Sequence, residues 1–511
     1  MEKKPELMDT TLRDGEQMEG VSFSPQDKLM IARKLFDIGI NRIEVSSARA
    51  VNKDFTALQE ICKYAERIGR RDSVEVLTFI DNQKSVDWVT DAGCKTVNLL
   101  AKGSRKHCEG QFGKTLEQHI ADIAKVTDYA RSRGVTTVNA YLETWSDGML
   151  ALEKGDTYVL DLTKALVNMG VTRVMLADTR GELLPWEVEK YVRWMHEQSF
   201  GLHYDFHPHN DRGLGTANAL SAIRAGIDGV HVTLNGLGER AGNCSLYEVV
   251  TGANDCLKLD MCINEKAFYE LRRLVEAASK IRLSPHTPIV GDNANKQTAG
   301  VHADGDQKDR LYELVIPPER VGKTRTEYAL GKQSGIASID MNLKQMGLEA
   351  DVETRKKLTA EVRRLGEQGK LVTQEDLYFL LEELADEPTK RAFQFVDVRP
   401  EISLNGPRQS YIRVKVDGTE LDARATGDGA FDATMKALAD VMAKKGITLP
   451  KLVDYQTRIP TGGQTDAIVE TLIEWQNGTK FRTVGVDTDQ FFAAIKATEK
   501  MVNLVMRGYK R

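Results

Sequence analysis

The sequence predicts an α/β protein: a TIM (β/α)8 barrel, helical linker subdomains, and a C-terminal α+β domain of two sheet-plus-helix repeats. Three observations predict this architecture. Short apolar runs alternate with amphipathic segments over about the first 250 residues, polar motifs follow the ends of those runs, and the end of the chain contains a weak internal repeat. An open doubly wound sheet is the structural alternative, but it would not bring the first and last strands together.

The first half of the chain contains the strand and helix patterns of a barrel. Its expected strands are Glu6–Thr11, Arg42–Ser46, Ser73–Phe79, Thr96–Leu100, Thr137–Leu142, Arg173–Ala177, His203–His207 and Gly229–Thr233. Between them, Asp27–Ile38 and Leu116–Arg133 show the 3.6-residue spacing of amphipathic helices. Strands that alternate with helices form parallel βαβ units, and about eight such units in roughly 250 residues build a TIM barrel.

After the barrel the pattern becomes helical, and a polar loop is expected over Asp292–Leu311. The expected helices of this part are Glu270–Lys280, Val352–Gly366 and Gln374–Leu384. The last part repeats the order strand, turn, strand, helix, and its expected helices are Asp432–Ala443 and Gln490–Val505. We therefore predict three domains, at 1–264, 265–390 and 391–511.

The composition excludes several classes of protein. The 511 residues are 41% hydrophobic and 28% charged, which is typical of soluble globular proteins. The net charge of −5 gives no reason to expect a nucleic-acid or membrane partner. The sequence has no apolar stretch of membrane-span length and no signal-peptide pattern. Its six cysteines form no CxxC motif, which favours a reduced cytoplasm over disulfides or a zinc–thiolate site.

The segment His207-Pro208-His209-Asn210-Asp211 holds the strongest candidate for a metal site. It follows a predicted strand, and residues i and i+2 of a strand point to the same face, so His207 and His209 should project together. A carboxylate that could complete the set lies far upstream, within the motif DTTLRDGEQ at Asp9–Gln17, which offers Asp9, Asp14 and Glu16. Such a set leaves coordination positions open for a substrate and accepts Mg, Mn, Co or Zn. Taken alone, an HxH pair is also typical of a surface loop without a ligand.

Several polar motifs lie directly after predicted strands. They are Arg13-Asp14, Glu143, Asp178-Thr179, His207 with His209, and Asn235–Asn243. In a TIM barrel the carboxyl ends of the strands form the active-site face. We therefore expect these distant segments to meet at one end of the barrel.

Three of these motifs carry a resemblance to a known family. DTTLRDGEQ, HPHND and NGLGERAGN together resemble the acyl-CoA condensing metalloenzymes of the DRE-TIM metallolyase type, which include the 2-isopropylmalate, homocitrate and citramalate synthases. The resemblance covers nearly the whole chain. It is strongest to the long, isoleucine-regulated (R)-citramalate synthases, through VSFSPQDKLMIARKL, EVSSAR, NLLAKGS, YLETWSDG, AGVHADGD, EYALGKQSG and PKLVDYQTRIPTGGQTDAIVET.

The resemblance implies a Claisen-type condensation of acetyl-CoA with a 2-oxo acid, followed by thioester hydrolysis. The implied ligands of a divalent metal ion are Asp14, His207 and His209, with Asn243 as a weaker oxygen donor. Arg13 is implied to stabilise the developing alkoxide. The alternative for Arg13 is a structural ion pair that orients Asp14.

The proton-transfer group is left open among three residues that the resemblance implies. Glu143 matches an active-site glutamate, and its alternative is a hydrogen-bond partner in the metal shell. His302 and Tyr312 match a segment that reaches the neighbouring subunit's barrel, which implies a homodimer; His302 is alternatively a lid contact. His119 and His196 lie on helical segments and are expected at the surface.

The choice of 2-oxo acid depends on apolar side chains at strand ends. Leu77, Leu100 and Tyr141 match the pocket of the citramalate enzymes, where bulky groups favour pyruvate over 2-oxoisovalerate; alternatively they are barrel-core residues. Thr179 matches a threonine that meets the substrate carboxylate, although Arg180 replaces the family's usual apolar residue. Homocitrate synthesis is disfavoured because a second substrate carboxylate would need a basic partner here.

The C-terminal repeat resembles the amino-acid-sensing domain of leucine-pathway synthases. The resemblance implies an effector site near Asp432, Tyr455 and Gly463, for isoleucine in a citramalate synthase or leucine in an isopropylmalate synthase. A related acyl-CoA lyase generally lacks this domain. A catalytically dead sensor is disfavoured because every motif residue for the chemistry is present.

Overall fold

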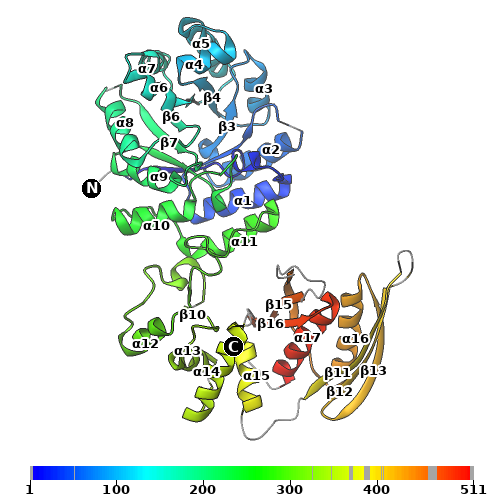
Figure 1. The fold of residues 1–511 in the computed structure, drawn as a ribbon. Helices are drawn as coiled ribbons and strands as arrows, with labels where there is room; N and C mark the ends of the chain where they lie inside the picture. The colour runs from blue at the N-terminus through cyan, green and yellow to red at the C-terminus, as the bar shows by residue number, and fades with distance from the viewer. Residues whose placement is uncertain are drawn as a thin grey trace. The chain divides into compact units, whose positions relative to one another are not determined.

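The computed structural model describes residues 4–50, 52–198, 200–324, 326–346, 348–367, 372–384, 392–403, 406, 408–458 and 469–506. The chain divides into two compact units (Figure 1). Unit 1 comprises Met1–Ala294 and Ile316–Arg325, and unit 2 comprises Asn295–Val315 and Thr326–Arg511. The domain boundaries that we expect near 264 and 390 stay predictions.

Unit 1 is a closed barrel of parallel strands, as the sequence predicts (Figure 1). β1 pairs with both β2 and β8. The strands are β1 (Glu6–Asp9), β2 (Arg42–Ser47), β3 (Val74–Thr78), β4 (Thr96–Lys102), β5 (Thr137–Glu143), β6 (Arg173–Asp178), β7 (His203–Pro208) and β8 (Gly229–Val232). Every expected strand overlaps an observed one. The first and last strands are hydrogen-bonded neighbours, which rules out the open sheet.

Helices surround the strands of the barrel. They are α1 (Pro25–Ile38), α2 (Asn52–Arg67), α3 (Lys84–Asp91), α4 (Arg105–His107), α5 (Leu116–Ser132), α6 (Trp145–Leu152), α7 (Tyr158–Asn168), α8 (Pro185–Glu197), α9 (Gly215–Arg224), α10 (Leu246–Cys256) and α11 (Phe268–Ser279). Local sequence explains the ends of α1: Ser24 and Asp27 form a capping box, and Gly39 ends the helix at φ 100°.

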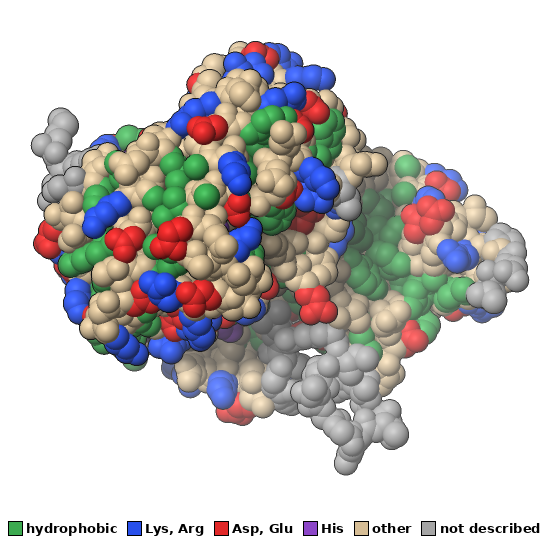
Figure 2. All heavy atoms as spheres, turned by 90° about the horizontal axis from the view of Figure 1, so that it is seen from above, with side chains coloured by type: hydrophobic (Ala, Val, Ile, Leu, Met, Phe, Trp, Pro, Cys, Tyr) green, Lys and Arg blue, Asp and Glu red, His purple; other side chains and the backbone are tan. Residues whose placement is uncertain are grey.

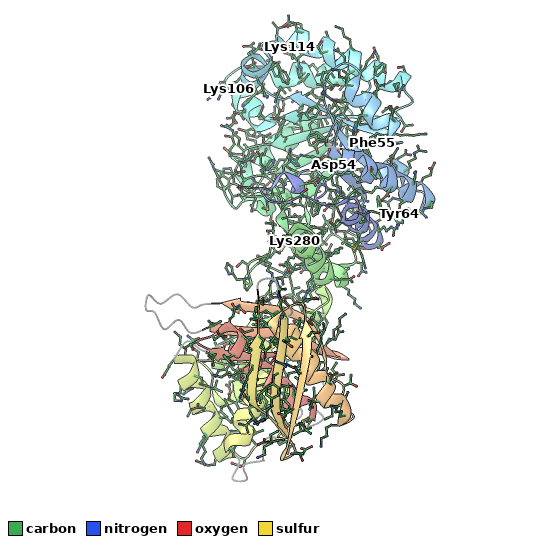
Figure 3. The ribbon with its side chains drawn as sticks, turned by 90° about the vertical axis from the view of Figure 1, so that its right-hand side faces the viewer. Asp54, Phe55, Tyr64, Lys106, Lys114 and Lys280 are labelled. Atoms are coloured by element: carbon green, nitrogen blue, oxygen red, sulfur yellow. The ribbon has the colours of Figure 1, made fainter. Side chains whose placement is uncertain are left out.

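A buried lysine joins the first two helices to the loop after β1. Lys28 on α1 contacts Glu16 Oε2 and Asp54 Oδ1, each at 2.6 Å, and donates to the carbonyl of Leu12 at 3.0 Å. Asp54 comes from α2 (Figure 3). Because Leu12 directly precedes Arg13, this ammonium group fixes the backbone that carries the predicted metal ligand.

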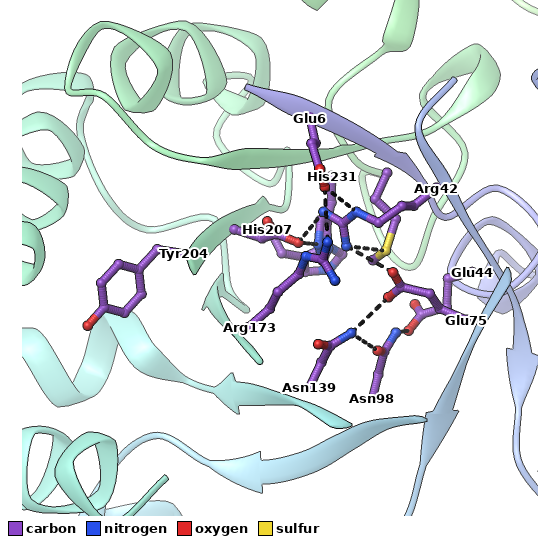
Figure 4. A network of polar contacts seen from close by, with 12 residues as sticks. Glu6, Arg42, Glu44, Glu75, Asn98, Asn139, Arg173, Tyr204, His207 and His231 are labelled. Carbon is purple, nitrogen blue, oxygen red and sulfur yellow. Dashed lines mark hydrogen bonds and ion pairs between the residues drawn. The ribbon is translucent and has the colours of Figure 1, made fainter. Parts of the chain in front are cut away.

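The barrel has two kinds of interior. Apolar side chains such as Ile31, Leu58 and Val97 fill the layer between strands and helices. Inside the strands, the apolar cluster is small and consists of Met8, Leu77, Tyr141 and Met175, with Leu100 packed against it. Buried polar side chains occupy much of the remaining interior (Figure 4).

Unit 2 begins with a short parallel pair, β9 (Lys296–Gln297) and β10 (Glu327–Tyr328). Its helices before the C-terminal repeats are α12 (Gly300–Asp309), α13 (Ile336–Met346), α14 (Val352–Glu367) and α15 (Gln374–Leu384). Leu330, Ile339, Leu343, Leu358 and Val362 are among the buried residues of this part.

The expected loop over Asp292–Leu311 is wrong at Gly300–Asp309, which is helical. This helix has no apolar stripe and is stabilised by contacts that periodicity does not reveal. Asp306 accepts hydrogen bonds from the backbone N–H of Tyr312 at 2.7 Å and from Tyr328 Oη at 2.8 Å. Gly305 lets the Tyr312 ring approach, because a Cβ there would lie 2.5 Å from that ring.

The C-terminal part contains the two repeats that the sequence predicts. The first is β11 (Phe393–Glu401), β12 (Arg408–Val416), β13 (Thr419–Gly427) and α16 (Ala430–Lys444); the second is β14 (Lys451–Arg458), β15 (Val469–Asn477), β16 (Thr479–Asp487) and α17 (Gln490–Met506). Each repeat begins with one strand more than the two that the sequence predicts, β11 in the first repeat and β14 in the second. Both of these additional strands have a register shift near their start. The repeats share one core that includes Phe393, Val414, Leu438, Trp475 and Met501.

The surface shows no sign of a strongly charged face in the view that Figure 2 gives of the described residues, where Lys and Arg lie among Asp and Glu. Among the described helices, none combines the length and apolar character that a membrane crossing requires. All six cysteines are free thiols.

Candidate metal centre

The structure brings together the three side chains that the sequence predicts as metal ligands. His207 lies near the end of β7, His209 follows that strand, and Asp14 lies in the loop after β1. Asp14 Oδ2 is 3.1 Å from His207 Nε2 and 4.0 Å from His209 Nε2. All three side chains are buried, and their nearest ligand atoms lie within 4.8 Å of one another.

Burial and charge prepare these groups for a cation. Burial would raise the pKa of Asp14, but the Arg13 guanidinium and the two imidazoles outweigh it and hold that pKa well below its usual range. Burial and the neighbouring His207 lower the pKa of His209 to about 4, and burial also lowers the pKa of His207. At neutral pH the carboxylate is therefore ionised and the imidazoles are neutral, which are the forms that bind metals.

Orphaned atoms around the cluster also fit a cation. Among the described residues, Asp14 Oδ1, His209 Nδ1 and Asn243 Oδ1 are buried and have no hydrogen-bond partner. Asn243 Nδ2 donates to Asp14 Oδ2 at 3.0 Å and to the Leu237 carbonyl at 3.1 Å, which leaves the amide oxygen as a further donor atom. Two imidazole nitrogens with carboxylate and amide oxygens form a mixed set that suits Mg, Mn, Co or Zn.

Arg13 is held beside the cluster by partners other than Asp14. Its Nε lies 2.5 Å from Glu44 Oε2, its Nη2 donates to Tyr141 Oη at 3.2 Å, and its Nη1 is 3.4 Å from Asp14 Oδ1. The Glu44 contact is the shortest of the three, and the two roles expected for Arg13, stabilising an alkoxide or orienting Asp14, stay predictions.

Glu143, at the end of β5, forms an ion pair with Lys102, at the end of β4. Lys102 is buried, and its Nζ lies 5.1 Å from the centre of the Phe112 ring. Sequence reasoning missed Lys102. The available signal was strand alternation, because Lys102 shares a face with Asn98, which lies in the barrel interior.

The expectation that His119 lies at the surface is wrong. Its imidazole is buried, and Nε2 accepts a hydrogen bond from the Lys102 backbone N–H at 3.1 Å. Burial lowers the pKa of His119 to about 4. His196 is half-buried, with its ring centre 5.3 Å from that of Tyr204. The helical periodicity placed both residues on helices without showing that the helix face bearing His119 packs against a strand end.

The predicted specificity residues lie together inside the barrel. Leu77, Leu100 and Tyr141 belong to the small apolar cluster. The Tyr141 ring packs edge-on against His207, with centres 5.7 Å apart, so this cluster adjoins the candidate metal centre. Sequence reasoning did not include Met8 and Met175, which belong to the same cluster.

Thr179 follows β6 and is held by two neighbours. Its hydroxyl accepts a hydrogen bond from the Thr144 backbone N–H at 2.8 Å, and its carbonyl accepts from Arg240 at 2.7 Å. Arg180, the departure from the family pattern, contacts Asp147 at 2.9 Å and is exposed. Its guanidinium therefore has a partner of its own and does not displace Thr179.

His302 and Tyr312 lie in unit 2, whereas the candidate ligands lie in unit 1. Their rings stack with centres 4.3 Å apart and an interplanar angle of 20°. The structure thus brings these two predicted residues together with each other.

The predicted regulatory residues lie in the C-terminal repeats. Asp432, in the first turn of α16, pairs with Lys436 at 2.8 Å. Tyr455 on β14 contacts the ring of Phe431, with centres 5.5 Å apart, which links the two repeats. Gly463 lies outside the described residues.

A polar network runs through the barrel interior from the candidate ligand His207 to Arg13, and Figure 4 shows much of it. In order it joins His207, His231, Asp205, Arg42, Glu75, Asn139, Asn98, Glu44 and Arg13. Sequence reasoning missed His231, although it shares an inward strand face with Gly229, whose absent Cβ would clash with Asp205 inside the barrel.

Comparisons with known protein families match most of the chain in three parts. Residues 4–275 match the HMGL-like family, 289–370 match the homocitrate synthase post-HMGL domain-like family, and 371–506 match the LeuA allosteric (dimerisation) domain. The chain is 35% identical to a putative (R)-citramalate synthase of Methanopyrus kandleri, over 90% of this chain and 88% of that protein.

Two further relatives cover nearly all of the chain. A putative (R)-citramalate synthase of Archaeoglobus fulgidus is 32% identical over 98% of this chain and 99% of its own length. A probable 2-isopropylmalate synthase of Methanopyrus kandleri is also 32% identical, over 99% of each chain. Relatives of both names therefore share the full arrangement of domains.

Proposed function

This chain belongs to the HMGL-like family, in the group of acyltransferases that includes the citramalate and 2-isopropylmalate synthases, and we propose that it condenses acetyl-CoA with pyruvate to form (R)-citramalate. The observation that carries this proposal is the buried cluster of Asp14, His207 and His209 at the strand ends, with Arg13 beside it. Its donor atoms suit a cation that a 2-oxo acid can also bind.

Asp14, His207 and His209, with the amide oxygen of Asn243, would hold the divalent metal ion. When bound, this ion supplies a Lewis acid that polarises the ketone of a 2-oxo acid.

Arg13 is proposed to stabilise the negative charge that develops on the ketone oxygen. Glu44 and Tyr141 fix its guanidinium, so little reorganisation is needed when charge develops. Its Nη1, 3.4 Å from Asp14 Oδ1, lies on the side of the candidate metal ligands. A fixed cation beside a polarised carbonyl is the arrangement that electrostatic catalysis requires.

Proton removal from the acetyl-CoA methyl group is proposed for Glu143, with His302 and Tyr312 as the alternative. Lys102 holds the Glu143 carboxylate in place at the strand ends. The stacked His302 and Tyr312 would instead act from the partner subunit of a homodimer, which the match to a dimerisation domain supports. Glu143→Gln removes the first base and leaves the second intact.

The apolar cluster supports pyruvate as the substrate. Leu77, Leu100 and Tyr141, together with Met8 and Met175, fill the barrel interior beside His207 with large side chains. A small pocket accommodates the methyl group of pyruvate more readily than the isopropyl group of 2-oxoisovalerate. The second candidate, 2-isopropylmalate synthesis, is favoured by the relative of that name that matches nearly the whole chain.

A thiol-release assay with acetyl-CoA and a panel of 2-oxo acids tests the function. We expect pyruvate to give the highest kcat/KM among pyruvate, 2-oxobutyrate, 2-oxoisovalerate and 2-oxoglutarate. Highest activity with 2-oxoisovalerate would reject the substrate but keep the reaction. No metal-dependent thiol release with any member would reject the condensation itself.

The C-terminal repeats are proposed to bind an amino-acid effector, isoleucine if pyruvate is the substrate or leucine if 2-oxoisovalerate is. Support comes from the match to the LeuA allosteric (dimerisation) domain and from the contact of Tyr455 with Phe431 between the repeats. We expect removal of 391–511 to abolish inhibition by the effector more completely than basal activity. Inhibition that persists in the shortened protein would place the effector site elsewhere.

A further inference from the structure

His231, on β8, lies directly behind the predicted metal ligand His207. Its Nδ1 is 3.2 Å from His207 Nδ1 (Figure 4), and its Nε2 is 3.1 Å from Asp205 Oδ2. All three side chains are buried. His207 presents its other nitrogen, Nε2, to Asp14. The imidazole of His231 therefore bridges a carboxylate and a ligand that faces the metal centre.

Metal binding fixes the direction of both hydrogen bonds. A metal at His207 Nε2 uses the lone pair of that nitrogen, so the proton of the neutral ring lies on Nδ1. That N–H faces His231 Nδ1, which must then accept the hydrogen bond. His231 consequently carries its own proton on Nε2 and donates it to Asp205, because an ionised carboxylate only accepts.

The Tyr141 hydroxyl also lies near His231, but it does not compete with His207 as a donor to His231 Nδ1. Tyr141 Oη is 3.2 Å from His231 Nδ1 but only 3.0 Å from the carboxylate of Glu44. A phenol has one proton, and the charged acceptor is the stronger one. Tyr141 therefore donates to Glu44, which leaves His231 Nδ1 for His207.

The Asp205 carboxylate, which accepts the hydrogen bond from His231, is itself fixed in position. Arg42 Nη2 donates to Asp205 Oδ2 at 2.6 Å, and His203 Nε2 lies 3.0 Å from Asp205 Oδ1. Gly229 provides the space, because a Cβ at that position would lie 2.1 Å from Asp205 Oδ1. The position of Asp205, and with it the donor direction of His231, is thus determined by the barrel itself.

We propose that His231 is a positioning residue: anchored to Asp205, it accepts the Nδ1 proton of His207 and so holds His207 Nε2 as a lone pair aimed at the metal. This proposal rests on the proposed metal site and adds a function for residues that no motif of the sequence singled out. Groups that orient a ligating histidine in this way typically change metal affinity by about 10–100-fold when they are lost.

Metal binding by the full-length, metal-free protein provides the test, with Co²⁺ as the probe. The dissociation constant comes from competition with a chromophoric chelator, and the visible absorption of bound Co²⁺ reports the geometry of the site. We expect His231→Leu, which removes the acceptor, to raise this constant about 10–100-fold and to alter the spectrum. His231→Gln keeps an acceptor and should bind Co²⁺ much more tightly than His231→Leu, close to the wild type.

His203→Gln is the matched control, because His203 contacts the same carboxylate but not His207. It should bind Co²⁺ as the wild type does. Wild-type affinity and spectrum in His231→Leu, with only a lower melting temperature, would overturn the proposal. Equal weakening in His231→Leu and His231→Gln would overturn the acceptor role. A wild-type protein that binds no Co²⁺ would instead reject the metal site itself.

A measurement on the wild-type protein decides the matter if His231→Leu does not fold. In full-length protein labelled with ¹⁵N-histidine and loaded with Zn²⁺, ring-nitrogen shifts report which nitrogen carries the proton. We expect protons on His207 Nδ1 and on His231 Nε2. A proton on His231 Nδ1 would contradict the proposal.

Discussion

The interior of the barrel and the core of the C-terminal repeats are both enclosed by strands and helices, yet they contain different chemistry. The barrel buries the charged groups Arg13, Asp14, Arg42, Glu44, Glu75 and Asp205, whereas the shared core of the repeats is apolar and includes Phe393, Val414, Leu438, Trp475 and Met501. Buried ion pairs are weak contributors to stability, whereas buried apolar surface stabilises by roughly 25 cal/mol per Å². Stability alone therefore explains the core of the repeats but not the interior of the barrel.

Removing a predicted metal ligand has the largest expected effect. It tests whether the polar interior of the barrel exists for function. We expect His207→Ala to lower kcat/KM by on the order of 10⁴-fold, because one of two imidazole donors is lost. Thiol release and the metal content of the purified protein measure the effect. His286→Ala, at an exposed histidine, should retain both. Full metal content and activity in His207→Ala would remove the functional reason for a polar interior.

A cavity in the C-terminal core tests whether the apolar core of the repeats serves stability. Trp475 is fully buried and donates to Thr483 Oγ1 at 2.8 Å. Trp475→Ala should lower the free energy of unfolding of the C-terminal repeats by about 3–5 kcal/mol, measured by denaturant titration. Trp186→Ala is the control, because that side chain is 66% exposed. Effector-free kcat/KM should be unchanged; an equal loss of activity would show that the two regions do not differ in role.

A buried polar group away from the metal centre should make the barrel sensitive to acid. The pKa of His119 is about 4 in the folded protein, below its ordinary value of about 6.5. The unfolded chain therefore binds a proton first as pH falls, and stability present above about pH 6.5 is lost below it. Between pH 7 and pH 5 this contributes about 2 kcal/mol to the loss of unfolding free energy.

His119→Gln isolates that contribution, because glutamine can still accept the hydrogen bond from Lys102 but does not titrate in this range. Denaturant titrations at pH 7 and pH 5 should show the smaller decline in His119→Gln. The same decline in both proteins would mean that His119 takes up its proton without unfolding.

The smallest expected effect concerns the few apolar residues inside the barrel. Leu100→Ala should raise the kcat/KM ratio of 2-oxoisovalerate to pyruvate by about 10-fold, since a few methylene groups in a pocket are worth about 1–3 kcal/mol. The thiol-release assay with both substrates measures it. Leu58→Ala, in the outer apolar layer, should leave the ratio unchanged. An unchanged ratio in Leu100→Ala would assign that residue to packing alone.

The strands and the two candidate histidines were predictable because both depend on local patterns, whereas Asp14 was identified as a ligand only through the family resemblance of its motif. Strand periodicity gave the barrel, and the i, i+2 spacing of His207 and His209 placed both on one face. The helix at Gly300–Asp309 was not predictable, because Asp306 and Tyr328 stabilise it through contacts between distant segments. For the same reason a helical position gave no sign that His119 is buried.

The partners of the candidate site were also hidden from the sequence. Lys102 lies within the segment NLLAKGS but no role was assigned to it there, and His231 lies outside every motif. The importance of both residues follows only from the side chains that face them. The additional strands β11 and β14 were missed. In β11 many side chains are exposed, so its sequence gives little apolar signal.

Gly229 has a consequence for any attempt to re-engineer this enzyme. Its backbone conformation is ordinary, and the groups nearest to its Cβ position are Asp205 and Arg42, not the candidate ligands. An engineer who keeps only the active-site residues constant would therefore allow this position to vary. Every other amino acid would push a methyl group or more into the Asp205–Arg42 pair. In a saturation library, this position should tolerate as little variation as the active-site residues, and computational redesign should keep it constant.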